Sequence, residues 1–231
     1  RKGMRAGRPE EQPLYTVDDA YNAMTNFVVH DFDKDVEVVP GVIARFRVAG
    51  HILGSAYVEL HISENGKDTK IIFTGDIGQP DQPIIDDPAH ISGADFIITE
   101  STYGNKVHEE YDKEAELTQI INDTVAKGGN VVIPAFAVGR TQVLLYYFQK
   151  LLAAKKIPDI PIYIDSPMAT KVTGITINST GEFDAEAQEI VKEQGRLYAM
   201  PNVHFTATPQ ESRMINTIEG PKIILSASGM A

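Results

Sequence analysis

Up to about Gly104, the chain shows the alternation of apolar and polar residues that is typical of half-buried β-strands. The segments predicted to be strands are 42–48, 56–62, 70–73 and 95–99, the last of them short and buried. Asn65 and Gly66 give a strong turn signal before the third segment, which therefore completes an antiparallel ladder. One helix is predicted ahead of these strands, over about 17–29, where Thr16 and Asp19 form a weak capping box.

Beyond Gly104 the pattern changes to helices that alternate with strands. The predicted helices cover about 110–126, 141–154, 184–194 and 210–217, and the predicted strands cover 130–134, 161–165, 203–205 and 222–226. Strands that are separated by single helices form parallel, doubly wound sheets. The sequence therefore predicts an α/β fold in two parts, with an antiparallel sheet first and a parallel sheet after it.

Composition limits the classes of protein to which the chain can belong. Its 231 residues correspond to about one and a half domains. The 21 Lys and Arg against 32 Asp and Glu give a net charge of −11, which does not favour nucleic-acid binding, although one local basic groove would allow it. The absence of cysteine excludes disulfides, thiolate metal sites and cysteine nucleophiles. Because we find no targeting signal and no apolar run of about 18 residues, we expect a cytoplasmic protein that does not span a membrane.

Polar residues of the kind that carry chemistry follow several of the predicted strands. His51 lies in a loop between two glycines, Asp76 follows Gly75 at the end of a strand, and Glu100 ends the next one. Taken singly, each of these residues is more often structural, since a lone histidine beside a turn or a Gly-Asp turn is common in proteins. Their order and spacing carry more weight than any one of them.

In order, these motifs resemble those of one family, the metallo-β-lactamase-fold nucleases of the β-CASP group. This group includes the nuclease subunit of the pre-mRNA cleavage and polyadenylation factor. The matching segments run from Pro13 to Ala231, and the motifs are Gly50-His51-x-Leu53-Gly54-Ser55, Gly75-Asp76, Glu100-Ser101-Thr102-Tyr103-Gly104, Gly129-x-Val131-x-Ile133-Pro134-x-Phe136-Ala137-x-Gly139-Arg140, Asp165-Ser166-Pro167-Met168-Ala169 and Ser226-Ala227-Ser228-Gly229-Met230.

The resemblance implies a fold and an activity. Residues 1–103 would form part of a metallo-β-lactamase αββα sandwich, and 104–231 an inserted β-CASP domain that is truncated at its C-terminal end. The activity implied is that of a zinc-dependent hydrolase of phosphodiester bonds, with RNA as the expected substrate and two zinc ions in the intact enzyme. Positive potential should then be confined to the cleft between the domains, with the acidic excess on the outer faces.

The resemblance also implies roles for individual residues. His51 would be a ligand of one zinc ion, and Asp76 a catalytic carboxylate that bridges both ions. Imidazole nitrogen and carboxylate oxygen are ligands that zinc accepts, and a carboxylate has the two oxygens that bridging needs. Glu100 would act in catalysis by orienting a histidine, because a carboxylate behind a histidine fixes its tautomer.

Other positions are implied less directly. Ser228 and Gly229 match a loop that lies near the scissile phosphate, and they are the predicted substrate-binding residues. His108 stands where many members of the family have a histidine, and no role is assigned to it. Arg140 is interpreted as structural or as facing a phosphate.

The chain departs from the family pattern at its main metal motif, His-x-His-x-Asp-His, which is absent. The six histidines are His30, His51, His61, His90, His108 and His204, and no two of them stand two positions apart. The histidine that pairs with Glu100 in the family would follow Ala231. We therefore expect the middle piece of a longer enzyme rather than a degenerate relative without metal, and we expect this piece to be inactive alone.

Other functions stay open at this point. The substrate could be DNA, the protein could be a non-catalytic scaffold paralogue, or the parallel sheet could bind a small molecule. An evenly acidic cleft would favour the scaffold. Nothing in the sequence distinguishes endonuclease from exonuclease cleavage, and a homodimer is left open.

Overall fold

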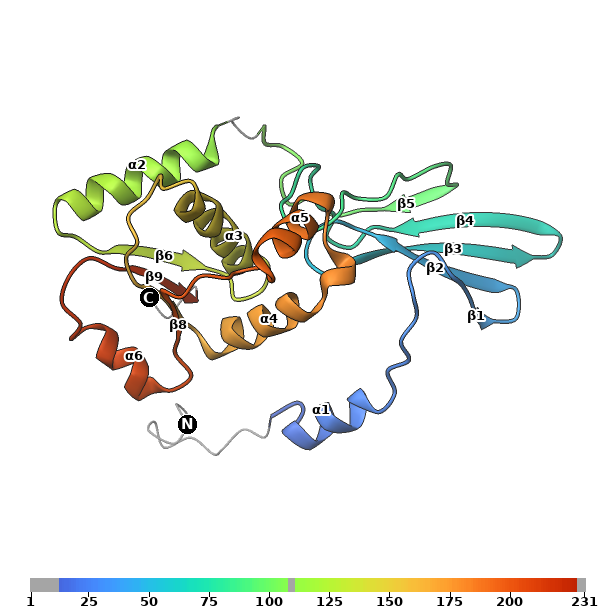
Figure 1. Cartoon of the computed structure of the whole chain (residues 1–231). Coiled ribbons are helices and arrows are strands. Elements are labelled where there is room, and N and C mark those ends of the chain that lie inside the picture. Colours follow the sequence, from blue (N-terminus) through green and yellow to red (C-terminus); the bar gives the residue numbers. More distant parts are fainter. Residues whose placement is uncertain (1–12, 108–110, 228–231) are drawn as a thin grey trace.

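The computed structural model describes residues 13–107 and 111–227, which form two β-sheets with helices around the second (Figure 1). The first sheet has the order β1-β2-β3-β4-β5. Its strands are β1 (Asp35–Val39), β2 (Val42–Val48), β3 (Ala56–Glu64), β4 (Lys67–Phe73) and β5 (Phe96–Ile98). The first four are antiparallel, and β5 runs parallel to β4. The predicted ladder is thus confirmed.

Two features of this sheet differ from the prediction. β1 was not predicted, because its five residues form only a short alternating pattern before the turn at Pro40 and Gly41. β5 was predicted to be buried, and this was wrong. Its three apolar residues are each more than half exposed, because β5 is an edge strand and packs on one side only.

The two faces of the first sheet have different environments. Tyr57 and Ile72 share one face and are fully buried, because the segment 89–94 packs over them. The strand register places a largely apolar set of side chains on the opposite face, with Phe73, Phe96 and Ile98 among its most exposed members. Within the part of the chain that the structure describes, the opposite face is covered only in part, since Ala44 on it is buried and His30 stacks on Phe46.

The second sheet is entirely parallel, with the order β6-β9-β7-β8. Its strands are β6 (Val131–Ala135), β7 (Ile162–Asp165), β8 (Val203–Phe205) and β9 (Ile223–Ala227). The flanking helices are α2 (Lys113–Ala126), α3 (Arg140–Ala153), α4 (Pro167–Asn178), α5 (Ala185–Gln194) and α6 (Pro209–Ile215). In Figure 1, α2 lies above this sheet and α6 below it. The predicted α/β fold is therefore confirmed.

The main hydrophobic core lies in the second half and joins it to the first. Leu145 and Phe148 of α3 are fully buried against the parallel strands, as the spacing of apolar residues in this helix predicts. Ile84, from the connection between β4 and β5, belongs to the same core as Phe183. The backbone N–H of Asp184 donates to the carbonyl of Ile84 at 2.9 Å, which anchors the first half to the second.

Helix α1 (Val17–Met24) is shorter than predicted and stands apart from both sheets (Figure 1). Thr16 and Asp19 form the expected capping box, but none of the residues of α1 is buried. The helix ends at Thr25 because no described part of the protein packs on the apolar face that would extend it. Among residues 13–107 and 111–227, no helix combines the length and apolar character that crossing a membrane requires.

Candidate functional site

His51 and Asp76 lie close together at one edge of the first sheet, where strands β2 and β4 end. His51 belongs to the loop after β2, where the Ser55 hydroxyl accepts hydrogen bonds from the backbone N–H groups of His51 and Ile52 at 3.0 and 3.2 Å. Asp76 follows β4, which has the same direction as β2 because β3 lies antiparallel between them. The two side chains therefore converge, and His51 Nε2 lies 3.9 Å from Asp76 Oδ2.

Two glycines allow the loops of His51 and Asp76 to pack backbone against backbone. The N–H of Gly78 donates to the carbonyl of Ala49 at 2.8 Å. A Cβ atom at Gly78 would overlap the carbonyl oxygen of Gly50, and Gly50 itself has a φ of +63°. Residues without a side chain are therefore required at this contact, which sets the separation of His51 and Asp76.

Glu100, the third predicted residue, lies at the same edge. It follows β5, and its carboxylate accepts hydrogen bonds from the N–H of Ile77 at 3.2 Å and from the N–H of Thr102 at 3.3 Å. Hydrogen bonding from the Thr102 side chain, followed by these two N–H groups, lowers the pKa of Glu100, and the charge of His51 adds to the effect. The carboxylate is therefore held ionised beside the loop that carries Asp76.

The second sheet meets this edge through the loop between β6 and α3. Gly139, with a φ of +79°, lies so close to the loop of His51 that a Cβ atom would come within 2.8 Å of Ile52 Cγ2. Arg140 begins α3 at this point and is exposed. The carboxyl end of β6 thus borders the site formed by His51, Asp76 and Glu100.

The structure brings three of the predicted site residues together, and their roles stay predictions. Ser228, Gly229 and His108 lie outside the described residues. No cluster of three or more metal-binding side chains occurs within residues 13–107 and 111–227. His51 and Asp76 supply an imidazole nitrogen and a carboxylate oxygen, so the donor set fits zinc as a partial ligand set.

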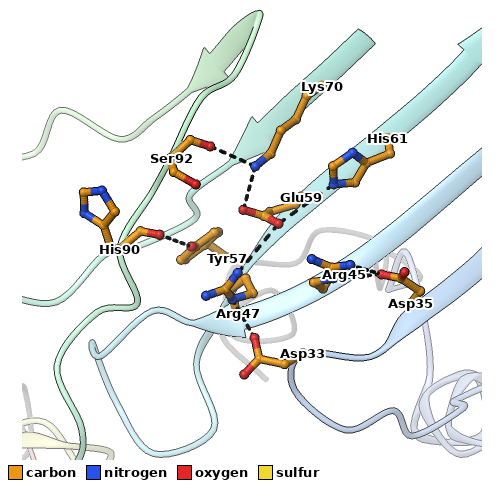
Figure 2. Close-up of polar contacts among 10 residues, drawn as sticks. All are labelled: Asp33, Asp35, Arg45, Arg47, Tyr57, Glu59, His61, Lys70, His90 and Ser92. Atoms are coloured by element: carbon orange, nitrogen blue, oxygen red, sulfur yellow. Dashed lines mark hydrogen bonds and ion pairs between the residues drawn. The ribbon is translucent and has the colours of Figure 1, made fainter. Parts of the chain in front are cut away.

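Sequence reasoning did not single out the buried ion cluster on the packed face of the first sheet (Figure 2). Glu59 is 2% exposed, and its carboxylate lies 3.0 Å from Lys70 Nζ and 3.9 Å from both Arg47 Nη1 and His61 Nε2. Lys70 also donates to the carbonyl of Ser92 at 2.9 Å. The alternation of β3, which puts Glu59 on the face of Tyr57, was the available signal. Because these contacts join β2, β3 and β4 to the covering segment, the cluster is structural.

Comparison with known proteins identifies a Beta-Casp domain over residues 141–231. The chain is 31% identical to Ribonuclease TTHA0252 of Thermus thermophilus, over 80% of the chain and 42% of that protein. It is 34% identical to Cleavage and polyadenylation specificity factor 73 of Drosophila melanogaster, over 71% of the chain and 24% of that protein. It is 28% identical to Transcription termination factor FttA of a Lokiarchaeum species, over 94% of the chain and 34% of that protein. The chain therefore spans less than half the length of each of these relatives.

Proposed function

Since the chain carries a Beta-Casp domain and is a distant homologue of the metallo-β-lactamase and β-CASP nucleases, we propose that it belongs to a zinc-dependent phosphodiesterase that cleaves RNA. The observation that carries the proposal is the convergence of His51, Asp76 and Glu100 at one sheet edge. These residues come from three separate segments of the chain, and each matches a motif in the order of the family.

Each of these residues has a defined task in the proposed site. His51 and Asp76 would hold zinc through Nε2 and the carboxylate oxygens. Bound zinc supplies a Lewis acid and lowers the pKa of a water molecule that it binds. Glu100, ionised at neutral pH, would accept a hydrogen bond from a histidine and fix its tautomer, so that the imidazole can donate a proton to the leaving oxygen. Glu100 is therefore a positioning residue in this scheme.

We further propose that the two sheets belong to two domains, a metallo-β-lactamase domain over 1–103 and a β-CASP domain over 104–231, with RNA bound between them. The contact between Gly139 and Ile52 supports this arrangement, because it brings the carboxyl end of β6 to the edge that carries His51. Ligands of parallel α/β sheets gather at the carboxyl ends of the strands.

The test is a cleavage assay with the complete protein that contains this chain. Labelled RNA and DNA oligonucleotides of the same sequence are incubated with the zinc-loaded protein and with the chelated protein. We expect zinc-dependent cleavage of RNA, a loss of more than about 100-fold in Asp76→Asn, and a loss of about 10- to 100-fold in Glu100→Gln. His204→Ala serves as the control, because His204 stacks on Tyr163 in the second sheet and is not part of the site.

The outcomes separate the competing functions. Preferential cleavage of DNA would mean that DNA, and not RNA, is the substrate. Tight RNA binding without zinc uptake and without cleavage would favour the scaffold. Cleavage that persists in Asp76→Asn and in the chelated protein would contradict the proposed site.

A further inference from the structure

Phe136 is an exposed aromatic residue in the loop that borders the candidate site. It follows β6 directly, and its side chain is 71% exposed. Leaving a phenylalanine ring in water is unfavourable, since burial of such a side chain is worth about 1.5–3 kcal/mol. The loop that carries Phe136 ends at Gly139, which packs against Ile52, the neighbour of His51.

The backbone around this ring is held firmly although the ring is exposed. The carbonyl of Phe136 accepts hydrogen bonds from the hydroxyl and the N–H of Thr141, at 2.9 and 3.2 Å. The buried side chain of Gln142 donates to the carbonyl of Ala137 at 3.2 Å and to the Thr173 hydroxyl at 2.9 Å. These contacts fix the loop to the start of α3, so the backbone that carries the ring is held in place before any ligand arrives. A pre-positioned group loses less entropy on binding.

A second aromatic residue at this edge does not offer the same free surface. Tyr103 follows Glu100 by three residues and is 56% exposed, but the ammonium group of Lys106 lies 5.8 Å from the centroid of its ring. Phe136 has no such cation on its ring among the described residues. It is therefore the better candidate for contact with a ligand.

We propose that the Phe136 ring stacks on a base of single-stranded RNA next to the scissile phosphate, which would lie at the site of His51 and Asp76. This inference rests on the proposed function and adds a base-binding residue to it. Every nucleobase has a flat aromatic face, so stacking on an exposed ring binds single strands with little sequence preference. An apolar ring without hydrogen-bonding groups suits this kind of recognition, because it reads no base edge.

The test measures RNA binding by the complete protein that contains this chain, with the fluorescence anisotropy of a labelled oligoadenylate. We expect Phe136→Ala to weaken binding by about 5- to 100-fold, which is the usual range for removing one stacking ring. Phe136→Leu keeps an apolar side chain but has no aromatic face, and it should weaken binding to a similar degree. Phe136→Trp should retain or improve binding. Circular dichroism of each variant verifies the fold.

Two controls separate stacking from other effects. Phe27→Ala removes a ring of nearly equal exposure, 70%, from the segment after α1 and should leave binding unchanged. An oligonucleotide with abasic sites should bind the wild type and Phe136→Ala equally. If the wild type binds oligoadenylate and Phe136→Ala binds it as tightly, the stacking role is overturned while the proposed function stands. If the wild type binds no RNA, the inference and the RNA assignment both fail.

Discussion

At the scale of single residues, the hydrogen bonds of Glu100 lead to a prediction about its ionisation. The hydroxyl and N–H of Thr102 and the N–H of Ile77 all favour the carboxylate, so the pKa of Glu100 should lie below the ordinary glutamate value. The stability that this provides is present above the unfolded-state pKa and is lost as the pH falls through the lower folded-state pKa.

A ¹³C NMR titration of the glutamate carboxyl carbons measures this value. Thr102→Val removes the hydroxyl but keeps the N–H, so we expect it to move the pKa of Glu100 part of the way back towards the ordinary value. Glu211 is the internal control, because the N–H groups of Ala207 and Thr208 lower its pKa at the start of α6. A titration of Glu100 that is the same in both proteins would assign the shift to the backbone alone.

The contact at Gly78 leads to a second prediction at this scale. In Gly78→Ala the added methyl group meets the Gly50 carbonyl oxygen, which belongs to a backbone and cannot turn aside. We expect the free energy of unfolding to fall by about 1–3 kcal/mol, the usual cost of overpacking. The His51 resonances should also shift, since the loops that carry His51 and Asp76 must move apart.

Gly181→Ala is the matched control for this substitution. No atom lies within 4 Å of the position of its Cβ, so its unfolding free energy should change by less than about 0.5 kcal/mol. Denaturant unfolding followed by circular dichroism compares the two variants. Equal midpoints for Gly78→Ala and the wild type would mean that the two loops adjust without strain.

At the scale of elements, Lys150 connects three helices of the second half. From α3, its ammonium group lies 2.8 Å from Glu186 Oε1 of α5 and 3.0 Å from Glu114 Oε1 of α2. The hydrogen bond from Lys150, followed by one from Tyr146, lowers the pKa of Glu186. We expect Lys150→Met to lower the free energy of unfolding by about 0.5–1 kcal/mol at pH 7, a modest value because the pair is partly exposed.

The pH dependence of this effect follows from the lowered pKa of Glu186. The contribution of Glu186 is present above its ordinary pKa of 4.5 and is lost as the pH falls through the lower folded-state value. The difference between the wild type and Lys150→Met should therefore shrink below pH 4.5. Lys192→Met is the control, since Lys192 pairs with Glu189 on the surface of α5 alone and should change stability very little. If the difference in unfolding free energy between the wild type and Lys150→Met grows as the pH falls, the ionised carboxylate of Glu186 is not its source.

Most elements of the second half could be predicted from the sequence because local signals agree with the tertiary packing. In α2, Asp112 caps the first turn and Gly128 follows the last, and α3 has an apolar face that meets the core. Helix α4 could not be predicted, because six of its twelve residues are β-branched and one is glycine. The Ser166 side chain and Pro167 begin this helix, and burial of Thr173 and Thr176 stabilises it.

At the scale of the whole molecule, the candidate site could be found from the order of the motifs but not from any one of them. His51, Asp76 and Glu100 stand 25 and 24 positions apart, so only the alignment of β2, β4 and β5 brings them to one edge. The motif of the β6–α3 loop was visible in the sequence, but its contact with the loop of His51 was not, because this contact depends on how the two sheets meet at Ile52 and Gly139. The site therefore depends on tertiary structure as much as on its motifs.

The uneven distribution of charge leads to a last prediction, on the salt dependence of RNA binding. Despite the net charge of −11, acidic side chains gather in one cavity between the 81–87 loop and helices α2, α3 and α5, which contains none of the candidate site residues. Because this cavity is lined by both halves of the chain, the prediction that the acidic excess lies on the outer faces is wrong at this place. Arg140, beside the site, has no ion pair within residues 13–107 and 111–227. Arg140 can therefore bind a phosphate there, although the net charge of the whole molecule repels RNA.

Binding of labelled single-stranded RNA, measured at several potassium chloride concentrations, should show a shallow dependence on salt, with a slope of about −1 to −2 in the plot of log K against log salt. Arg140→Gln should reduce the slope by about 0.7, the value for one phosphate contact on a single strand. Lys155→Gln is the control, because Lys155 lies just beyond the opposite end of α3, about 20 Å away. An unchanged slope in Arg140→Gln would place the phosphate contact elsewhere, whereas binding that does not weaken with salt would argue against a charged cleft and favour the scaffold.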